Sequence, residues 1–237
     1  MSVIVANNPH VSFPISPFGF IDDNFEPGTL NARWKTQTDV TPVPTGSIVD
    51  ESSQKSYEIA HPAAQRYDLN QSGVVQGLFT YQDVNAGEDF ELVGEVVYPD
   101  TTFSATNSMY LGVGLMFWYN SDNYTWLEAQ VHPTTGARIR WGRADDTDGH
   151  TSGVDVAPGI TIPVTPIYLK MELTGSVFEY FVSNDDSTYH SVGTLTATTL
   201  AANGTKMGII AETYHATPAS AVAWDAYCRS IKEIKSA

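Results

Sequence analysis

The sequence predicts an all-β protein, built as a sandwich or a barrel of short strands. Segments in which apolar and polar residues alternate follow one another from residue 21 onward, and turn residues separate them. Thr, Val, Tyr and Gly are common, whereas Lys and Glu, which usually fill the solvent-facing side of helices, are scarce. The chain has 237 residues, of which 42% are hydrophobic, so it is long enough for one large domain with a packed core.

The first 20 residues differ from the rest of the chain. They contain no Asp, Glu, Lys or Arg, and Pro9, Pro14 and Pro17 exclude a helix. We therefore predict an extended arm over residues 1–20 and a single β-sandwich domain over residues 21–237. A charge-free apolar tail in water would favour aggregation, so the arm either folds back on its own domain or docks on another chain. The candidate docking residues are Val3, Ile4, Val5, Phe13, Ile15 and Phe18.

Two strands are predicted near the middle of the chain. Residues 88–98 alternate, with Phe90 and Leu92 on one face and Glu91 on the other. Residues 109–119 are nearly all apolar, which is typical of a strand that is covered on both faces.

A hairpin is predicted after these strands. Its apolar side chains match only if Leu127 lies opposite Trp141, because register follows burial, and the same register places Ala129 opposite Ile139. This pairing needs a loop of odd length, and Gly136 suits the left-handed position in such a loop. The two strands cover residues 124–131 and 137–143.

Four more strands are predicted in the second half of the chain. Residues 167–173 place apolar residues on one face and charged or polar residues on the other, and residues 177–183 follow after Gly175. Residues 206–214 and 221–231 close the chain. Long loops, which often carry binding sites, are expected over residues 38–53 and 145–163.

The polar face of the predicted hairpin is a candidate glycan-binding surface. Trp126 would stand beside the carboxylate of Glu128 and the guanidinium groups of two arginines, with Trp118 nearby on the preceding strand. Aromatic rings stack on the C–H faces of sugars, and charged groups then fix the hydroxyls. The alternative is a cross-strand Glu–Arg pair on an ordinary solvent-facing surface. The candidate residues are Trp118, Tyr124, Trp126, Glu128, Gln130, Arg138 and Arg140.

Charge and composition limit the partners. The formal net charge of −15 disfavours binding to nucleic acid and to anionic lipid, and no segment approaches the ~20 apolar residues of a membrane span. The single cysteine, Cys228, excludes an intrachain disulfide and is expected to be a buried thiol. No signal peptide is visible after Met1, so we expect the protein either to be cytoplasmic or to leave by lysis, as virus particles do, and to act on a virion or particle surface.

Three groups of segments resemble the concanavalin A-like lectin/glucanase superfamily. The first is DDNFEPGTLNARW at residues 22–34, and the second is GLMFWYNSDNYTWLEA at residues 114–129. The third runs from residue 167 to residue 211 and includes IYLKMEL, FEYFVSNDD and MGIIA. The segments are most similar to non-catalytic β-sandwich modules appended to glycosidases, in which the chain ends with Phe-Asp where this sequence has Trp224 and Asp225.

The resemblance implies two antiparallel sheets in a jelly-roll sandwich, with the first and last strands close together. Asp22 or Asp23 would then lie near Asp225, and several members of the superfamily hold a structural calcium ion near such a place. The alternative is a solvated acidic edge. Apart from this calcium ion, we expect no cofactor.

The catalytic pattern of the superfamily's glucanases, Glu-x-Asp-x-Glu on one strand, is not complete. The nearest match runs from Glu91 to Glu95 and has Val93 in the central position, so we interpret both glutamates as solvent-facing. The six histidines are scattered without metal-ligand spacing. A hydrolase would have to draw a carboxylate pair from neighbouring strands, and the candidates are Glu128, Glu172 and Glu212.

The sequence thus predicts a non-catalytic, lectin-like structural or adhesion component of a larger particle, such as a phage decoration or appendage protein. Its partners would be other protein chains, reached through residues 1–20, with glycan binding as an added role. Two alternatives stay open, a soluble carbohydrate-binding module and a glycoside hydrolase.

Overall fold

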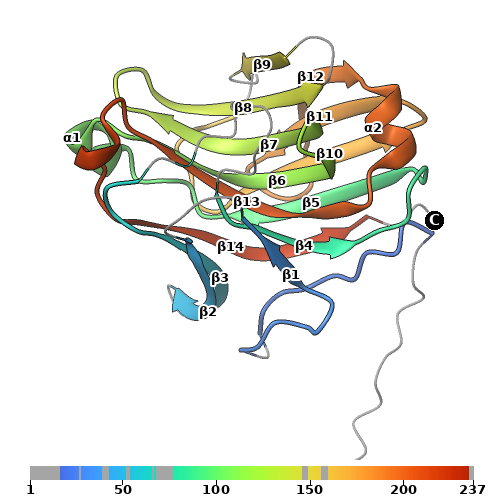
Figure 1. Cartoon of the computed structure of the whole chain (residues 1–237), viewed down its shortest axis with the longest axis horizontal. Helices are drawn as coiled ribbons and strands as arrows, with labels where there is room; N and C mark the ends of the chain where they lie inside the picture. The colour runs from blue at the N-terminus through green and yellow to red at the C-terminus, as the bar shows by residue number, and fades with distance from the viewer. Residues whose placement is uncertain are drawn as a thin grey trace, which may run out of the picture.

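The computed structural model describes residues 17–26, 28–38, 43–51, 54–65, 67, 77–145, 149–155 and 160–234. It confirms the all-β sandwich, in which two antiparallel sheets of seven strands each lie face to face (Figure 1). Sheet I has the strand order β1-β4-β13-β6-β7-β8-β9, and sheet II has the order β12-β11-β10-β5-β14-β3-β2. Half of the neighbouring strand pairs, including β4-β13, β13-β6, β5-β14 and β14-β3, are not consecutive in the chain, as expected for a jelly roll.

The strands of sheet I are β1 (Lys35–Gln37), β4 (Phe79–Asp83), β6 (Tyr110–Asn120), β7 (Asn123–His132), β8 (Gly136–Asp145), β9 (Gly149–Asp155) and β13 (Lys206–Tyr214). The strands of sheet II are β2 (Thr45–Glu51), β3 (Gln54–His61), β5 (Phe90–Val96), β10 (Ile167–Thr174), β11 (Val177–Ser183), β12 (His190–Thr196) and β14 (Trp224–Glu233). Two short helices, α1 (Thr101–Asn107) and α2 (Thr198–Asn203), and a 3₁₀ turn at Pro218–Ser220 complete the described elements. No helix in these described ranges is long and apolar enough to cross a membrane.

All eight strands expected from the alternation pattern are present. The prediction of two long loops is partly wrong, because residues 38–53 contain β2 and residues 145–163 contain β9. Both are edge strands of their sheets. An edge strand needs few apolar residues and is often polar, so the alternation signal is weak there. The same reason applies to β1 and β12, which the sequence pattern also missed. It does not apply to β3 and β4, which were missed although neither is an edge strand.

The β7–β8 hairpin has the predicted register. Leu127 pairs with Trp141 and Ala129 pairs with Ile139, and the turn between His132 and Gly136 has three residues. Gly136 has a φ of +82°, in the left-handed region that glycine tolerates best. Leu127, Ala129 and Ile139 are completely buried in the core between the sheets. Burial of one face therefore fixed the register, as expected.

The residues just before the predicted domain boundary belong to the core. Phe18 is 0% exposed and stacks on Phe90 of sheet II with 4.3 Å between the ring centroids, and Phe20 is also buried. Asn85 donates its backbone N–H to the carbonyl oxygen of Phe18 (2.8 Å). The interpretation of Phe18 as a docking residue is therefore corrected, since its ring fills the sandwich itself. The other docking candidates, Val3, Ile4, Val5, Phe13 and Ile15, lie outside the described residues.

Candidate functional site

The outward face of sheet I, which is turned away from sheet II, carries the candidate site. In the central strands β13, β6, β7 and β8, alternate residues point to this face while their neighbours fill the core. The registers align these outward residues in rows across the sheet. One row is Glu212, Gly112, Gln130 and Arg138, and the next is Ile210, Gly114, Glu128 and Arg140.

Two carboxyl groups from different strands meet at the centre of these rows. Arg140 Nη1 donates to Glu128 Oε1 (3.4 Å) and to Glu212 Oε1 (3.1 Å). Gln130 Nε2 donates to Glu128 Oε1 (2.9 Å) and also to Glu212. All four side chains are buried. We call Glu128, Gln130, Arg140 and Glu212 the carboxyl cluster.

A glycine makes room for the carboxyl cluster. A Cβ atom at Gly112 on β6 would clash with Oε2 of Glu128 and would lie 3.0 Å from Cγ of Glu212. Because Gly112 is paired with Glu212 on one side and Gln130 on the other, the missing side chain lets the two glutamates converge over β6. The local sequence of β6 thus determines what its neighbours can do.

Burial controls the protonation of the pair. Loss of hydration raises the pKa of Glu128 well above its ordinary value, and the negative charge of Glu212 raises it further, while Arg140 opposes both effects. Arg140 and Gln130 hold the two carboxyl groups side by side. The buried Glu128 therefore keeps its proton to a higher pH than an exposed glutamate would.

Large aromatic side chains lie on the same face beyond the carboxyl cluster. Trp118 stacks on Tyr124 (5.1 Å between centroids), Tyr124 contacts Trp126 (5.8 Å), and the Arg140 guanidinium lies 5.7 Å from the Trp126 ring. All three rings are at most 4% exposed. The seven glycan-binding candidates therefore do share one face, but the expectation that this face is open to solvent is wrong over most of its length. Neighbouring aromatic side chains form a second hydrophobic cluster there.

The opposite end of the face is partly exposed. Tyr110 of β6 lies between Tyr214 of β13 (5.1 Å, 87° between the rings) and His132 of β7 (4.4 Å). Arg138 of β8 lies 5.8 Å from the Tyr110 ring, and its Nε donates to Oε1 of Gln130 (2.5 Å). We call Tyr110, His132, Arg138 and Tyr214 the tyrosine end. It joins the carboxyl cluster through the Arg138–Gln130 hydrogen bond.

His132 has a structural role at the tyrosine end. Its Nδ1 accepts hydrogen bonds from the backbone N–H groups of Thr134 (3.1 Å) and Thr135 (3.2 Å) in the β7–β8 turn. Burial and the positive charge of Arg138 lower the pKa of His132, so it stays neutral near pH 7. Arg138 is therefore the cationic group of the tyrosine end.

Sequence reasoning missed Tyr110 and Tyr214. Both are outward residues at the ends of strands that the sequence did predict, 109–119 and 206–214. What the sequence did not provide is the pairing of β13 with β6, which joins residues about 100 positions apart. The signal available in the sequence was that each tyrosine alternates with apolar residues of its strand, which places it on the outward face.

The glutamates of the incomplete glucanase pattern lie on the other sheet. Glu91 pairs with Lys170 Nζ (3.2 Å) and Glu95 pairs with Arg229 Nη1 (3.8 Å) on the outward face of sheet II. Four residues of strand separate the two carboxyls by ~13 Å, which exceeds the spacing of glycosidase pairs. Glu172 also pairs with Lys170 (3.2 Å), away from the carboxyl cluster.

The structure does not bring the calcium candidates together. Asp23 forms a bridge with Ile231, so the two ends of the domain do lie side by side. Asp225, however, pairs with Ala60 and lies six residues from Ile231, or ~20 Å along β14. The carboxylate of Asp23 accepts hydrogen bonds from Phe25 N and Trp34 Nε1 (both 2.8 Å), and that of Asp22 accepts from Glu233 N (2.7 Å). Among the described residues, no three His, Cys, Asp or Glu side chains form a group that could hold a metal ion.

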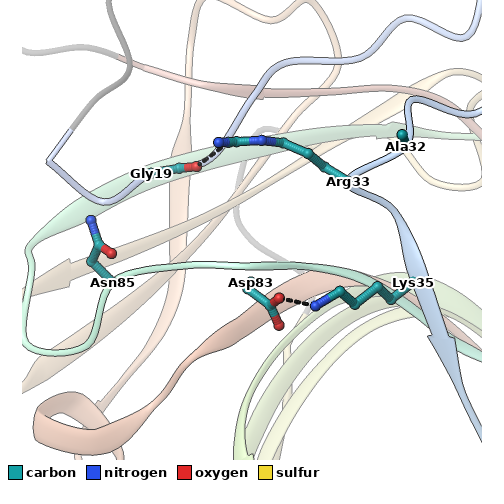
Figure 2. Close-up of a pocket in the computed structure, with 6 residues that line it drawn as sticks. All are labelled: Gly19, Ala32, Arg33, Lys35, Asp83 and Asn85. Atoms are coloured by element: carbon teal, nitrogen blue, oxygen red, sulfur yellow. Dashed lines mark hydrogen bonds and ion pairs between the residues drawn. The ribbon is translucent and has the colours of Figure 1, made fainter.

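An open pocket of about 410 Å³ lies where the N-terminal segment meets the sandwich. Figure 2 shows Arg33 pointing to the carbonyl oxygen of Gly19 (3.1 Å) and Lys35 paired with Asp83. The Lys35 and Asp83 side chains are more than half exposed. These contacts hold the segment that carries Phe18, and we assign the pocket this structural role.

Comparisons with known proteins support the fold. No protein-family model and no curated protein matches the chain. The GH43 BlXynB protein from Bacillus licheniformis has a similar structure (TM-score 0.64, 14% identity), over 90% of this chain and 39% of that one. This chain therefore spans about two fifths of the length of that protein.

Two further solved structures match along most of both chains. One is a glycoside hydrolase family 16 endo-glucanase from Bacteroides ovatus (TM-score 0.56, 7% identity, 90% of this chain and 99% of that one). The other is the CBM2 module of the evolved Dit protein of Lactobacillus casei BL23 phage J-1 (TM-score 0.55, 10% identity, 88% and 93%). The chain thus has the concanavalin A-like β-sandwich fold that the resemblance implied.

Proposed function

We propose that the protein is a non-catalytic, glycan-binding component of a larger particle, with its binding site at the tyrosine end of sheet I. The observation that carries the proposal is the continuous set of side chains on this face. Tyr110 and Tyr214 offer partly exposed rings, and Arg138 offers a guanidinium group that Gln130 holds in place. Sugar sites combine these two elements, a ring for stacking and a few fixed polar groups for orientation.

The carboxyl cluster suits a supporting role in such a site. Burying ionisable groups costs desolvation energy that their mutual attraction only partly offsets, so a purely structural sheet face gains little from them. Here the buried groups lock Gln130, and Gln130 in turn orients Arg138. Support of this kind limits the freedom that a binding side chain loses when a ligand arrives.

The same carboxyl cluster argues against hydrolysis. Glycosidase pairs stand about 5–5.5 Å or about 6.5–9.5 Å apart, so that a sugar or a water molecule fits between them. Glu128 and Glu212 instead share Arg140 and Gln130 as hydrogen-bond donors, and both side chains are buried. A sugar would have to displace these contacts to reach the pair, which supports a non-catalytic role.

The comparisons are compatible with glycan binding and with hydrolysis, and one of them motivates the particle role. The similar structures include glycosidases and a CBM2 module of a phage Dit protein. The phage module motivates the particle role, together with the charge-free residues 1–16.

A glycan array tests the binding proposal. We expect the full chain to bind at least one glycan, and Tyr110→Ala and Tyr214→Ala to weaken that binding about tenfold or more, since a lost aromatic contact removes most of the stacking energy. Tyr227→Ala is the matched control, because Tyr227 is a partly exposed tyrosine on the outward face of sheet II. Absence of any bound glycan, or equal binding by all variants, would contradict the proposal.

The particle role is tested by removing residues 1–16 rather than 1–20, since Phe18 and Phe20 are part of the core. We expect the shortened chain to unfold at the same denaturant concentration as the full chain but to lose association with other chains. Molar mass by light scattering measures the association. Two monomers of equal stability would contradict a docking role for the arm.

A further inference from the structure

We propose that the tyrosine end is a subsite for an acidic sugar, in which Arg138 binds the carboxylate and the rings of Tyr110 and Tyr214 bind the sugar ring. The inference rests on the proposed function and narrows it to carboxylated glycans such as hexuronic or sialic acids. It depends on the hydrogen bonds and the charge balance around Arg138.

Arg138 keeps its carboxylate-binding atoms available. Among the described residues, Gln130 is the only hydrogen-bond partner of the Arg138 side chain, and it takes up Nε. The two terminal nitrogens therefore still present their donors. A guanidinium group binds a carboxylate best through two parallel hydrogen bonds, and a group that is already held at Nε loses little freedom on binding.

No carboxylate pairs directly with Arg138 among the described residues. The carboxyl groups that act on it, those of Glu128 and Glu212, are held by Arg140 and Gln130 instead. Within the part of the chain that the structure describes, the Arg138 guanidinium is therefore a cationic group without a direct ion-pair partner, on a protein whose formal net charge is −15.

The aromatic rings add a surface for the sugar itself. Tyr110 and Tyr214 come from neighbouring strands and stand at 87° to one another, so the pair presents both a ring face and a ring edge. The face of a tyrosine ring is electron-rich and attracts the C–H groups of a pyranose. Arg138 lies 5.8 Å from the Tyr110 ring, which is close enough for one sugar to contact both.

The second exposed cluster of cationic side chains does not offer the same chemistry. Around the N-terminal pocket, Arg33 donates to the carbonyl oxygen of Gly19, and Lys35 is paired with Asp83 (Figure 2). The described residues that line that pocket include no aromatic ring. Arg33 is therefore a suitable control position rather than a competing site.

The test is a glycan array that carries each acidic oligosaccharide, uronic or sialic, beside its neutral methyl ester. We expect the full chain to bind at least one acid about 10- to 100-fold more tightly than its ester, the range for one hydrogen bond to a charged group. Arg138→Gln should lower acid binding to the level of the ester. Arg33→Gln should leave both unchanged.

The outcomes separate this inference from the proposed function. Equal binding of acids and esters, with loss of both in Tyr214→Ala, would overturn the acidic subsite but keep the glycan site. Acid preference that persists in Arg138→Gln would also overturn it. No binding to any glycan would overturn both. If Arg138→Gln fails to fold, Arg138→Lys decides, because it keeps the charge but not the fork and should lose part of the acid preference.

Discussion

The outward faces of the two sheets carry the same arrangement of charges in different surroundings. On sheet II, Lys170 bridges Glu91 and Glu172 at 3.2 Å each, with the lysine side chain 12% exposed and the carboxylates 31% and 28% exposed. On sheet I, Arg140 bridges Glu128 and Glu212 at 3.4 and 3.1 Å, with exposures of 8%, 1% and 2%. In each arrangement, one cationic side chain lies between two carboxyl groups that come from different strands.

The difference shows how strongly burial changes the meaning of an ion pair. The two carboxylates beside Lys170 are about 30% exposed, so solvent screens the attraction and its contribution to stability is small. Around Arg140 water is excluded, and removal of one partner would leave the others buried without compensation. The first trio is an ordinary surface feature, whereas the second depends on every one of its members.

Removal of Arg140 should have the largest effect. Arg140→Gln would leave the Glu128–Glu212 pair without its cation, and we expect a loss of about 3–5 kcal/mol in the free energy of unfolding. Urea denaturation measures it. A loss below about 1 kcal/mol would mean that the two faces do not differ in the way described.

Glu128→Gln should change how stability depends on pH. Folding raises the pKa of Glu128 above its ordinary value of 4.5. The protonated carboxyl group therefore stabilises the folded state fully below pH 4.5, and this stabilisation is lost as the pH rises through the folded-state pKa. Each unit of difference corresponds to about 1.4 kcal/mol. We expect the variant to gain stability relative to the native chain as pH rises. Glu172→Gln is the matched control, and a parallel gain there would contradict the assignment to the buried pair.

A methyl group at Gly112 should disturb the carboxyl cluster. Gly112→Ala would push against Glu128 and Glu212, and we expect a loss of about 1–3 kcal/mol, as is typical when a packed site receives an extra carbon. In a Glu128→Ala background the added methyl group has space, so the same change should cost much less. Additive losses in this double-mutant cycle would argue against contact between the two positions.

Removal of Lys170 should have the smallest effect. Lys170→Gln breaks the partly exposed trio on sheet II and a cation–π contact with Phe181 (4.2 Å), and we expect a loss of about 1 kcal/mol that shrinks at high salt. Denaturation at low and high ionic strength measures it. A loss of stability equal to that of Arg140→Gln would contradict the conclusion that burial makes the two trios differ.

The sequence was a good guide where one face of a strand is buried. The alternation in β5 and β10 reflects the core directly, and the register of the β7–β8 hairpin followed from matching Leu127 with Trp141. It was a poor guide at the edges, where β2 and β9 pair through their backbones and need no apolar pattern. The interpretation of Phe18 failed for a related reason, because an apolar residue in a charge-free segment has the same pattern whether it fills a core or an interface.

The sequence by itself determined the fold class, eight of the strands, and the presence of Trp126, Glu128, Gln130, Arg138 and Arg140 on one face of a hairpin. These follow from local rules, since side chains alternate along a strand and the apolar set must be buried. Only the tertiary structure decided that Glu212 and Tyr214 join this face through the pairing of β13 with β6. It also decided that the centre of the face is buried while the tyrosine end is partly exposed. Neighbouring strands are chosen by long-range contacts, and exposure depends on what surrounds each position, which no local pattern records.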